Sequence, residues 1–168
     1  MKLIRILNWL YLIVALTAIE SSCLAQTKKA VETKHYRLSL IVITNGSCAF
    51  KYEVDSLGNA VLNLGYSNNY MDSVLVFSSD KIKQFKYKIK GKQNIAELNG
   101  IVNKLASAEV VKGQHNADAW HCMVFINNMR KIDVYGTMES KELFKIIQKV
   151  ACCKKARLEP NRCIDELK

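Results

Sequence analysis

The side chains most suited to chemistry lie close together in residues 115–122. This stretch supplies two imidazoles, a carboxylate and a thiol, from His115, Asp118, His121 and Cys122. All four are of types that bind zinc. However, residues 120–126 are predicted to form a strand, and successive strand side chains point to opposite faces. His121 and Cys122 therefore cannot share a metal ion. His115, Asp118 and His121 remain candidate ligands, although we expect a partly buried His121, a solvated His115 and no metal or other cofactor.

Motifs of known catalytic machinery are missing from the sequence. It contains no G-x-S-x-G, no H-E-x-x-H, no phosphate-binding loop and no dinucleotide glycine pattern. A cysteine–histidine pair, such as Cys122 or Cys48 with His35, stays open. Cysteines of exported proteins are more often bridged or buried than catalytic. A small metal- or cysteine-dependent enzyme is therefore the least favoured function.

Lysines alternate with apolar residues in residues 85–90. The strict alternation predicts a half-exposed strand at a sheet edge, with Lys86, Lys88 and Lys90 on its solvent face. The aromatic residues of the strand would point inward, so a base-stacking nucleic-acid surface is not expected. The exposed lysines suit an anionic partner such as a polysaccharide, a lipid headgroup or an acidic protein surface. The Tyr-, Ser- and Asn-rich loop 66–71 adds two candidate recognition residues, Tyr66 and Tyr70.

The N-terminus has the layout of a secretory signal peptide. Lys2 and Arg5 precede an apolar run, and small residues follow it. The run is short beside the ~20 apolar residues that a spanning helix needs. We expect cleavage before Gln26, with lipoprotein processing at Cys23 or an uncleaved anchor as alternatives. Because residues 1–25 hold two basic residues and one acidic residue, the mature chain would keep 23 of the 25 basic and 14 of the 15 acidic side chains, a net charge of +9 without a transmembrane segment.

Cysteines of the mature chain are expected to act as structural links. Five remain after cleavage: Cys48, Cys122, Cys152, Cys153 and Cys163. In an oxidising compartment disulfides form readily, and an odd number leaves at least one thiol free or paired between chains. Cys152 or Cys153 could close a short loop with Cys163, and Cys48 could pair with Cys122 across neighbouring strands. Simple burial of Cys48 and Cys122 is the other interpretation.

Elements that position these residues follow from the hydrophobic periodicity. Alternation and turn signals predict strands at 36–43, 47–54, 60–66, 74–77, 85–90, 120–126 and 131–135, and the first is apolar on both faces, as in a central strand. Helical stripes predict one helix at 95–105, capped by Asn94 and Glu97, and another around 143–150, capped by Ser140. This order indicates an α+β fold: a mainly antiparallel sheet of about five to seven strands with two helices packed on one face.

One domain is expected from the 168 residues, of which 49% are hydrophobic and 24% charged, values that exclude wholesale disorder. It would span residues 26–168, with a loose arm at 26–34 and a C-terminal tail at 156–168 held by Cys163. Residues 117–120 through 134–136, followed by the helix of Leu143, Ile146 and Ile147, resemble small exported bacterial domains of unknown function. That resemblance is one of layout; it implies export, to the periplasm or the medium, and adds no catalytic residue.

The function that these features favour is a non-catalytic, exported binding or interaction module with a basic surface. Its partner would be an anionic envelope component or an acidic protein surface. The alternative is an inhibitor of an exported hydrolase, presenting loop 55–59 or loop 66–71. The oligomeric state and the ligand stay open.

Overall fold

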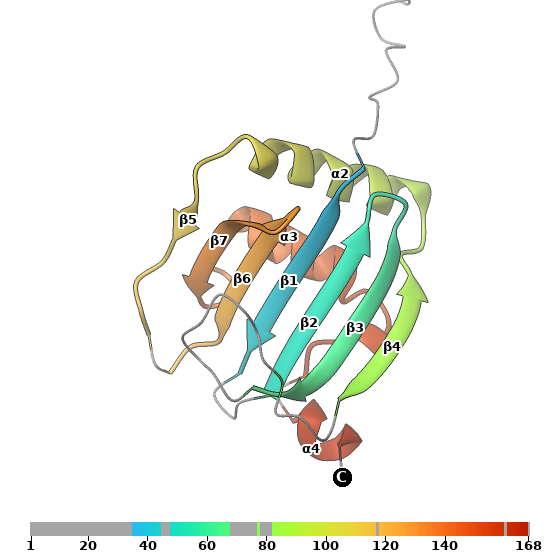
Figure 1. Ribbon diagram of the computed structural model, residues 1–168, viewed down its shortest axis with the longest axis vertical. Helices are drawn as coiled ribbons and strands as arrows, with labels where there is room; N and C mark the ends of the chain where they lie inside the picture. Colours follow the sequence, from blue (N-terminus) through green and yellow to red (C-terminus); the bar gives the residue numbers. More distant parts are fainter. Residues whose placement is uncertain are drawn as a thin grey trace, which may run out of the picture. The chain divides into compact units, whose positions relative to one another are not determined.

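The computed structural model of the chain describes residues 35–44, 48–67, 77, 82–116, 118–159 and 161–167. Within these ranges the chain forms, in order, β1 (Arg37–Ile43), β2 (Cys48–Asp55), β3 (Asn59–Tyr66), β4 (Lys83–Lys88), α2 (Lys92–Ala106), β5 (Val111–Lys112), β6 (His121–Ile126), β7 (Met129–Tyr135), α3 (Lys141–Val150), the 3₁₀ helix η1 (Lys154–Ala156) and α4 (Arg162–Glu166) (Figure 1). The expected signal peptide, the N-terminal arm and Cys23 lie outside the described residues. Of the expected strand at 74–77 only Phe77 is described, and it bridges Ser67.

The strands form a seven-stranded sheet in the order β4-β3-β2-β1-β6-β7-β5. Neighbouring strands are antiparallel, except that β5 runs parallel to β7. The prediction of an α+β fold with a mainly antiparallel sheet is confirmed. β1 lies in the middle of the sheet, between β2 and β6. Both of its faces are covered by apolar clusters. Leu40 and Val42 on one face and Ile41 and Ile43 on the other are at most 4% exposed, as expected for a central strand.

The larger hydrophobic core combines one face of the sheet with the apolar stripes of α2 and α3. In α2 the buried side chains are Leu98, Val102 and Leu105, and in α3 they are Leu143, Ile146 and Val150. All six belong to the same cluster as strand residues such as Phe50 and Val124. In Figure 1, α3 lies behind the sheet and α2 crosses its upper end. The opposite face of the sheet carries a smaller cluster of Ile41, Ile43, Ala49 and Met123.

The first residues of α2 differ from the expected capping box. The helix begins at Lys92, and its N-cap is Gly91, whose φ of 87° suits the sharp turn that follows β4. Asn94 therefore lies inside the first turn, where its side-chain amide donates to the Lys90 carbonyl at 2.9 Å. The predicted capping box of Asn94 and Glu97 is wrong, because the turn at Gly91 makes the helix begin at Lys92, two residues before Asn94.

Two other local signals are confirmed. Asn127 and Asn128 have φ values of 50° and 66°, the left-handed pair that a tight two-residue hairpin requires, and they join β6 to β7. Ser140 caps α3, because its hydroxyl oxygen accepts a hydrogen bond from the Leu143 backbone N–H at 3.3 Å.

The C-terminal tail is ordered by a buried cation. Arg162 is 5% exposed, and its guanidinium donates to the carbonyls of Lys155 and Arg157 at 2.6 and 2.7 Å. It also lies 4.8 Å from the centre of the Phe85 ring, a cation–π contact with β4. These contacts hold η1 and α4 beside the edge of the sheet. In the described part of the chain, no helix has the length and apolarity needed to cross a membrane.

Candidate functional site

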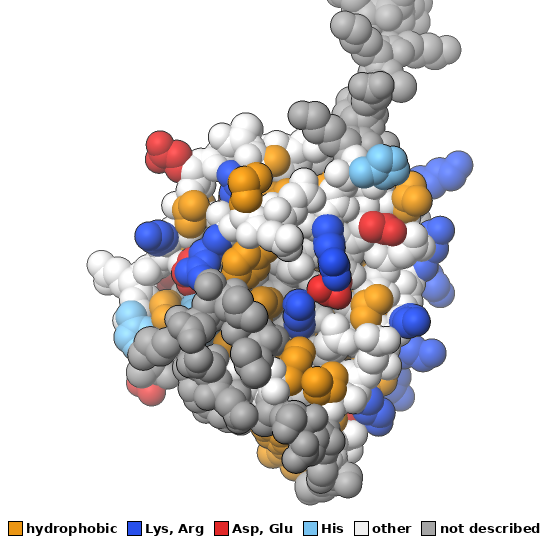
Figure 2. All heavy atoms as spheres, viewed as in Figure 1, with side chains coloured by type: hydrophobic (Ala, Val, Ile, Leu, Met, Phe, Trp, Pro, Cys, Tyr) orange, Lys and Arg blue, Asp and Glu red, His pale blue; other side chains and the backbone are white. Residues whose placement is uncertain are grey.

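A basic cavity opens beside β4, between the edge of the sheet and the segment that follows α3. Its volume is about 1080 Å³, slightly above the roughly 300–1,000 Å³ typical of small-molecule sites. Among the described residues, no Asp or Glu lines it, whereas six lysines do: Lys86, Lys88, Lys90, Lys92, Lys154 and Lys155. Figure 2 shows basic side chains gathered along the right-hand margin of the molecule, where β4 lies in Figure 1.

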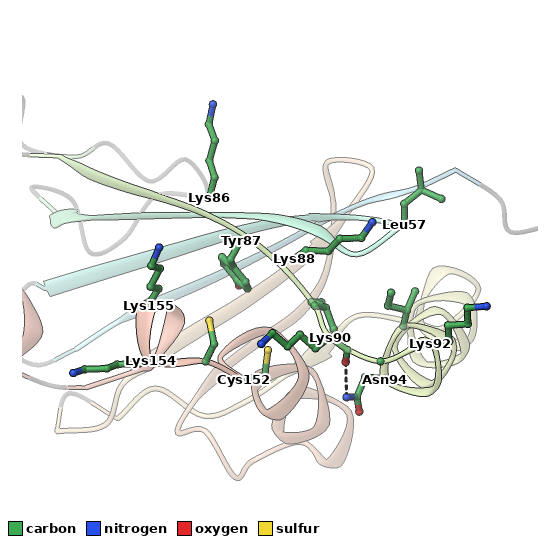
Figure 3. A pocket seen from close by; sticks show the side chains of 14 residues that line it. Leu57, Lys86, Tyr87, Lys88, Lys90, Lys92, Asn94, Cys152, Lys154 and Lys155 are labelled. Carbon is green, nitrogen blue, oxygen red and sulfur yellow. Dashed lines mark hydrogen bonds between the residues drawn. The ribbon is translucent and has the colours of Figure 1, made fainter.

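The alternation of β4 places its lysines at the mouth of this cavity. Among the described strands, β4 lies at one edge of the sheet and pairs with β3, with Lys88 opposite Asn59. Lys86 and Lys88 are exposed, while Tyr87 between them is half-buried against the core. In Figure 3, Lys90 extends into the cavity, whereas Lys86 and Lys154 extend outward at its mouth. The predicted exposure of the lysines of this strand and its edge position are therefore confirmed.

The interior of the cavity is less polar than its mouth. The Tyr87 hydroxyl donates to the Val150 carbonyl at 2.6 Å, which ties β4 to the end of α3. Burial raises the pKa of Tyr87, so this hydroxyl keeps its proton at physiological pH. Ile89 is 2% exposed and Ile95 is half-buried, while Leu57 is 57% exposed and completes the lining.

The charges of the cavity are uncompensated. Within the described ranges, none of the six lysines takes part in an ion pair. The acidic group nearby is Asp55, whose carboxylate accepts hydrogen bonds from the backbone N–H groups of Leu57 and Asn59, both at 2.9 Å. Burial tends to raise the pKa of Asp55, but these hydrogen bonds and the charge of Lys88 outweigh it and lower the pKa. Asp55 thus stays ionised but is committed to its own turn, and the cavity is electropositive.

The two candidate tyrosines do not join this cavity. Tyr66 lies at the far end of β3, opposite Cys48 of β2, whereas Lys88 is opposite Asn59 at the start of β3. At about 3.3 Å per residue, seven residues of strand separate Tyr66 from that position, roughly 23 Å. Tyr70 lies outside the described residues. The structure therefore separates Tyr66 from the lysine surface with which it was grouped.

Cys152 and Cys153 lie in the cavity as free thiols. In Figure 3, Cys152 and Lys155 rise from the segment after α3 toward Tyr87. Burial and the neighbouring Cys153 thiol raise the pKa of Cys152. The Cys152 thiol is therefore a poor nucleophile and behaves as a small apolar group.

The disulfide of the structure joins Cys48 to Cys163 and differs from both expected pairings. Cys48 and Cys122 cannot pair, because β1 lies between their strands, and two strand spacings of about 4.8 Å exceed the reach of a disulfide. Cys163 lies on α4, which packs against β2 and β3, so it meets Cys48 rather than Cys152 or Cys153. Cys122 is free and fully buried, and burial raises its pKa to about 12.

A second polar group lies on β6 and β7, on the face opposite the larger core. The Nε2 atom of His121 lies 2.7 Å from an Asp133 carboxylate oxygen, and Arg130 pairs with the other oxygen. The His121 ring stacks on Tyr135 with ring centroids 4.5 Å apart, and His115 contacts the same tyrosine edge-on at 4.6 Å. His121 is 9% exposed, and its Nδ1 atom has no hydrogen-bond partner among the residues that the structure describes.

The candidate metal ligands do not assemble around a common point. His121 faces the same side as Met123, and Cys122 faces the other side with Val124, as the strand alternation predicted. Asp118 lies in the exposed loop before β6. Among the residues that the structure describes, no group of three or more His, Cys, Asp or Glu side chains is placed to hold a metal ion. His121 is instead engaged by Asp133, a partner that the local sequence pattern did not indicate.

Three of the six lysines of the cavity were missed by sequence reasoning, namely Lys92, Lys154 and Lys155. Nothing in the spacing of Lys154 and Lys155 linked them to β4. Comparison with protein-family models, with curated proteins and with solved structures found no match to this chain. The resemblance to small exported bacterial domains therefore stays a prediction.

Proposed function

We propose that the protein is a non-catalytic binding module whose basic cavity takes an anionic component of the cell envelope. The observation that carries this proposal is that, among the described residues, six lysines line one cavity, no acidic side chain does, and none of the six forms an ion pair. Uncompensated like charges repel one another, and the arrangement becomes favourable when an anion neutralises them.

The setting that we propose is an exported α+β domain with both long helices on one face of the sheet. A structural disulfide is typical of proteins in oxidising compartments, which agrees with a leader of basic and then apolar residues at the N-terminus. Anionic polymers and lipids are abundant ligands outside the cytoplasm, so a basic cavity suits this location. Attachment through Cys23 is the alternative to release.

Binding in preference to catalysis is supported by the chemistry of the cavity. The pKa of the Cys152 thiol is raised rather than depressed, which disfavours the reactive thiolate. Its lysines are exposed rather than desolvated, so their surroundings do not provide the burial that activates a lysine nucleophile. The cavity thus combines positive charge with a partly apolar interior, an arrangement that suits binding of a ligand rather than its chemical conversion.

Binding of fluorescent dextran sulfate, with uncharged dextran as the control polymer, tests the proposal. We expect saturable binding that weakens between 50 and 200 mM NaCl, because salt screens exposed charges. A triple variant with Lys86, Lys88 and Lys90 changed to Glu should lose at least about tenfold in affinity. The charge-matched control changes three exposed lysines outside the cavity, Lys112, Lys141 and Lys145, to Glu. Equal losses in the two variants, or no binding by the parent protein, would show that the cavity is not the site.

A further inference from the structure

We infer that the ligand of the basic cavity is an amphiphile with one alkyl chain and an anionic head, of the fatty-acid or alkyl-phosphate class. This inference rests on the proposed function and adds the chemical class of the ligand. It follows from the way in which the cavity combines charge with apolar surface. Lys86 and Lys154 extend outward at the mouth and Lys90 extends inward, and the other lining surfaces are largely aromatic, aliphatic and thiol (Figure 3).

The apolar interior is the open end of the layer between the sheet and the helices. From the sheet, Tyr87 and Ile89 point toward the larger core, and from α2 the side chain of Ile95 packs against the same core. Cys153 is part of that contact, and Cys152 is exposed beside it. An alkyl chain that entered between β4 and the segment after α3 would extend the existing core rather than displace it.

The rim carries a further apolar side chain. Leu57 is 57% exposed and lines the cavity from the turn between β2 and β3. That turn is held by the Asp55 carboxylate, which accepts three hydrogen bonds from Leu57 and Asn59. In the free protein this large aliphatic side chain is exposed to water, which is unfavourable. A ligand with an apolar part would cover the side chain and remove it from water, whereas a purely ionic ligand would not.

An acidic peptide added to the free edge of β4 is the competing occupant. Strand addition uses the unpaired backbone groups of an edge strand and needs no cavity behind it. The row of exposed lysines on β4 is itself a device that discourages strand pairing. A volume of about 1080 Å³ behind the strand is explained by an inserted chain and not by an added strand.

The test compares four probes by titration calorimetry with the full mature protein: monomeric octyl phosphate, inorganic phosphate, octyl glucoside and a poly-glutamate peptide. Each methylene that leaves water raises affinity about fourfold, so four buried methylenes would favour octyl phosphate over inorganic phosphate on the order of 200-fold. Octyl glucoside, with the same chain and no charge, should bind at least about tenfold more weakly than octyl phosphate.

Two variants locate the binding site. Cys152→Glu places a carboxylate in the cavity at an exposed position and should weaken octyl phosphate at least about tenfold. Lys112→Gln on β5, at the other edge of the sheet, lowers the net charge by one, as Cys152→Glu does, and should leave octyl phosphate binding unchanged. A thermal-unfolding midpoint within about 2 °C of the parent's identifies variants that fold. If Cys152→Glu misfolds, Leu57→Asp at the exposed rim serves in its place.

The outcomes separate this inference from the proposed function. If octyl phosphate bound no more tightly than inorganic phosphate while dextran sulfate still bound, the inference of an amphiphilic ligand would be refuted. The cavity would then be a site for anions without an alkyl chain. Octyl glucoside equal to octyl phosphate would show that the lysines take no part and would refute the inference. Binding of poly-glutamate without octyl phosphate would assign the β4 edge to an acidic peptide. If neither dextran sulfate nor any of the four probes bound, the proposed function and this inference would fail together.

Discussion

Reduction of the Cys48–Cys163 disulfide should remove a large part of the stability of the protein. The bond joins residues 115 positions apart, so it restricts most of the unfolded chain. In the chain-entropy treatment, a loop of this length makes the folded state more stable by about 5 kcal/mol at 25 °C. Native disulfides of small exported domains contribute about 2–5 kcal/mol. Since both sulfurs are buried, at 2% and 1% exposure for their residues, we expect the free energy of unfolding to fall by about 3–5 kcal/mol.

Urea unfolding followed by circular dichroism, with and without a reducing agent, measures this effect. For an m-value of about 2 kcal/mol/M, the midpoint should fall by roughly 2 M. The matched control is the double variant Cys48→Ala/Cys163→Ala, whose midpoint should already be low and should not respond to the reducing agent. A fall below about 1 kcal/mol in fully reduced protein would refute the loop-entropy argument. A peptide map that links Cys163 to Cys152 or Cys153 would refute the pairing itself.

Four further predictions concern side chains described above. Tyr52→Phe removes the buried hydrogen bond that the Tyr52 hydroxyl donates to the Ala156 carbonyl at 2.7 Å, and it should lower the free energy of unfolding by about 1–2 kcal/mol; an unchanged urea midpoint would contradict this. Asp133→Asn removes the charge that engages His121, and it should lower the free energy of unfolding by about 1–3 kcal/mol. An unchanged free energy in the same unfolding assay would show that the pair does not stabilise the fold. Cys122, whose pKa is raised to about 12 by burial, should resist iodoacetamide until the protein unfolds, while the two cavity thiols react; mass spectrometry showing three equal labelling rates would be inconsistent with its burial. Ionised carboxylates with lowered pKa values add stability above pH ~4, their ordinary range, and this stability is lost as pH falls through the lowered values. Thermal unfolding from pH 7 to pH 2 should therefore show declining midpoints below about pH 4. A flat profile would contradict the lowered pKa values of the carboxyl groups concerned, which are Glu53, Asp55, Glu97, Glu142 and Glu166.

Local patterns were sufficient wherever one element determined the outcome. The strict alternation around Lys86 and Lys88 predicted an exposed lysine row on an edge strand, and β4 has both properties. The spacing of Leu98, Val102 and Leu105 predicted the buried face of α2. These predictions held because side-chain direction along a strand or helix repeats with a fixed period, which is already present in the sequence. The capping box at Asn94 failed because Gly91, a stronger turn residue, precedes it.

Contacts between distant segments were beyond those patterns. Nothing near Cys48 indicates that Cys163, rather than Cys122, is its partner, because the answer depends on β1 lying between β2 and β6. Likewise, Asp133 reaches His121 only through the register of β6 against β7. Strand order and register arise from packing all the elements together, and single-element periodicity does not encode them.

For this protein, then, the sequence by itself determined the two long helices and most of the strands, their faces, the α+β class and the basic character of one strand, whereas β5, η1 and α4 were not predicted. Only the tertiary structure decided that lysines from β4, from the start of α2 and from the segment after α3 surround one cavity. The physical reason is that exposure is a local property of a residue within its element. To line one cavity, lysines of different elements must be brought together in space, which requires the end of α3 to lie beside the edge of the sheet. There the Tyr87 hydroxyl donates a hydrogen bond to the carbonyl of Val150, 63 positions further along the chain.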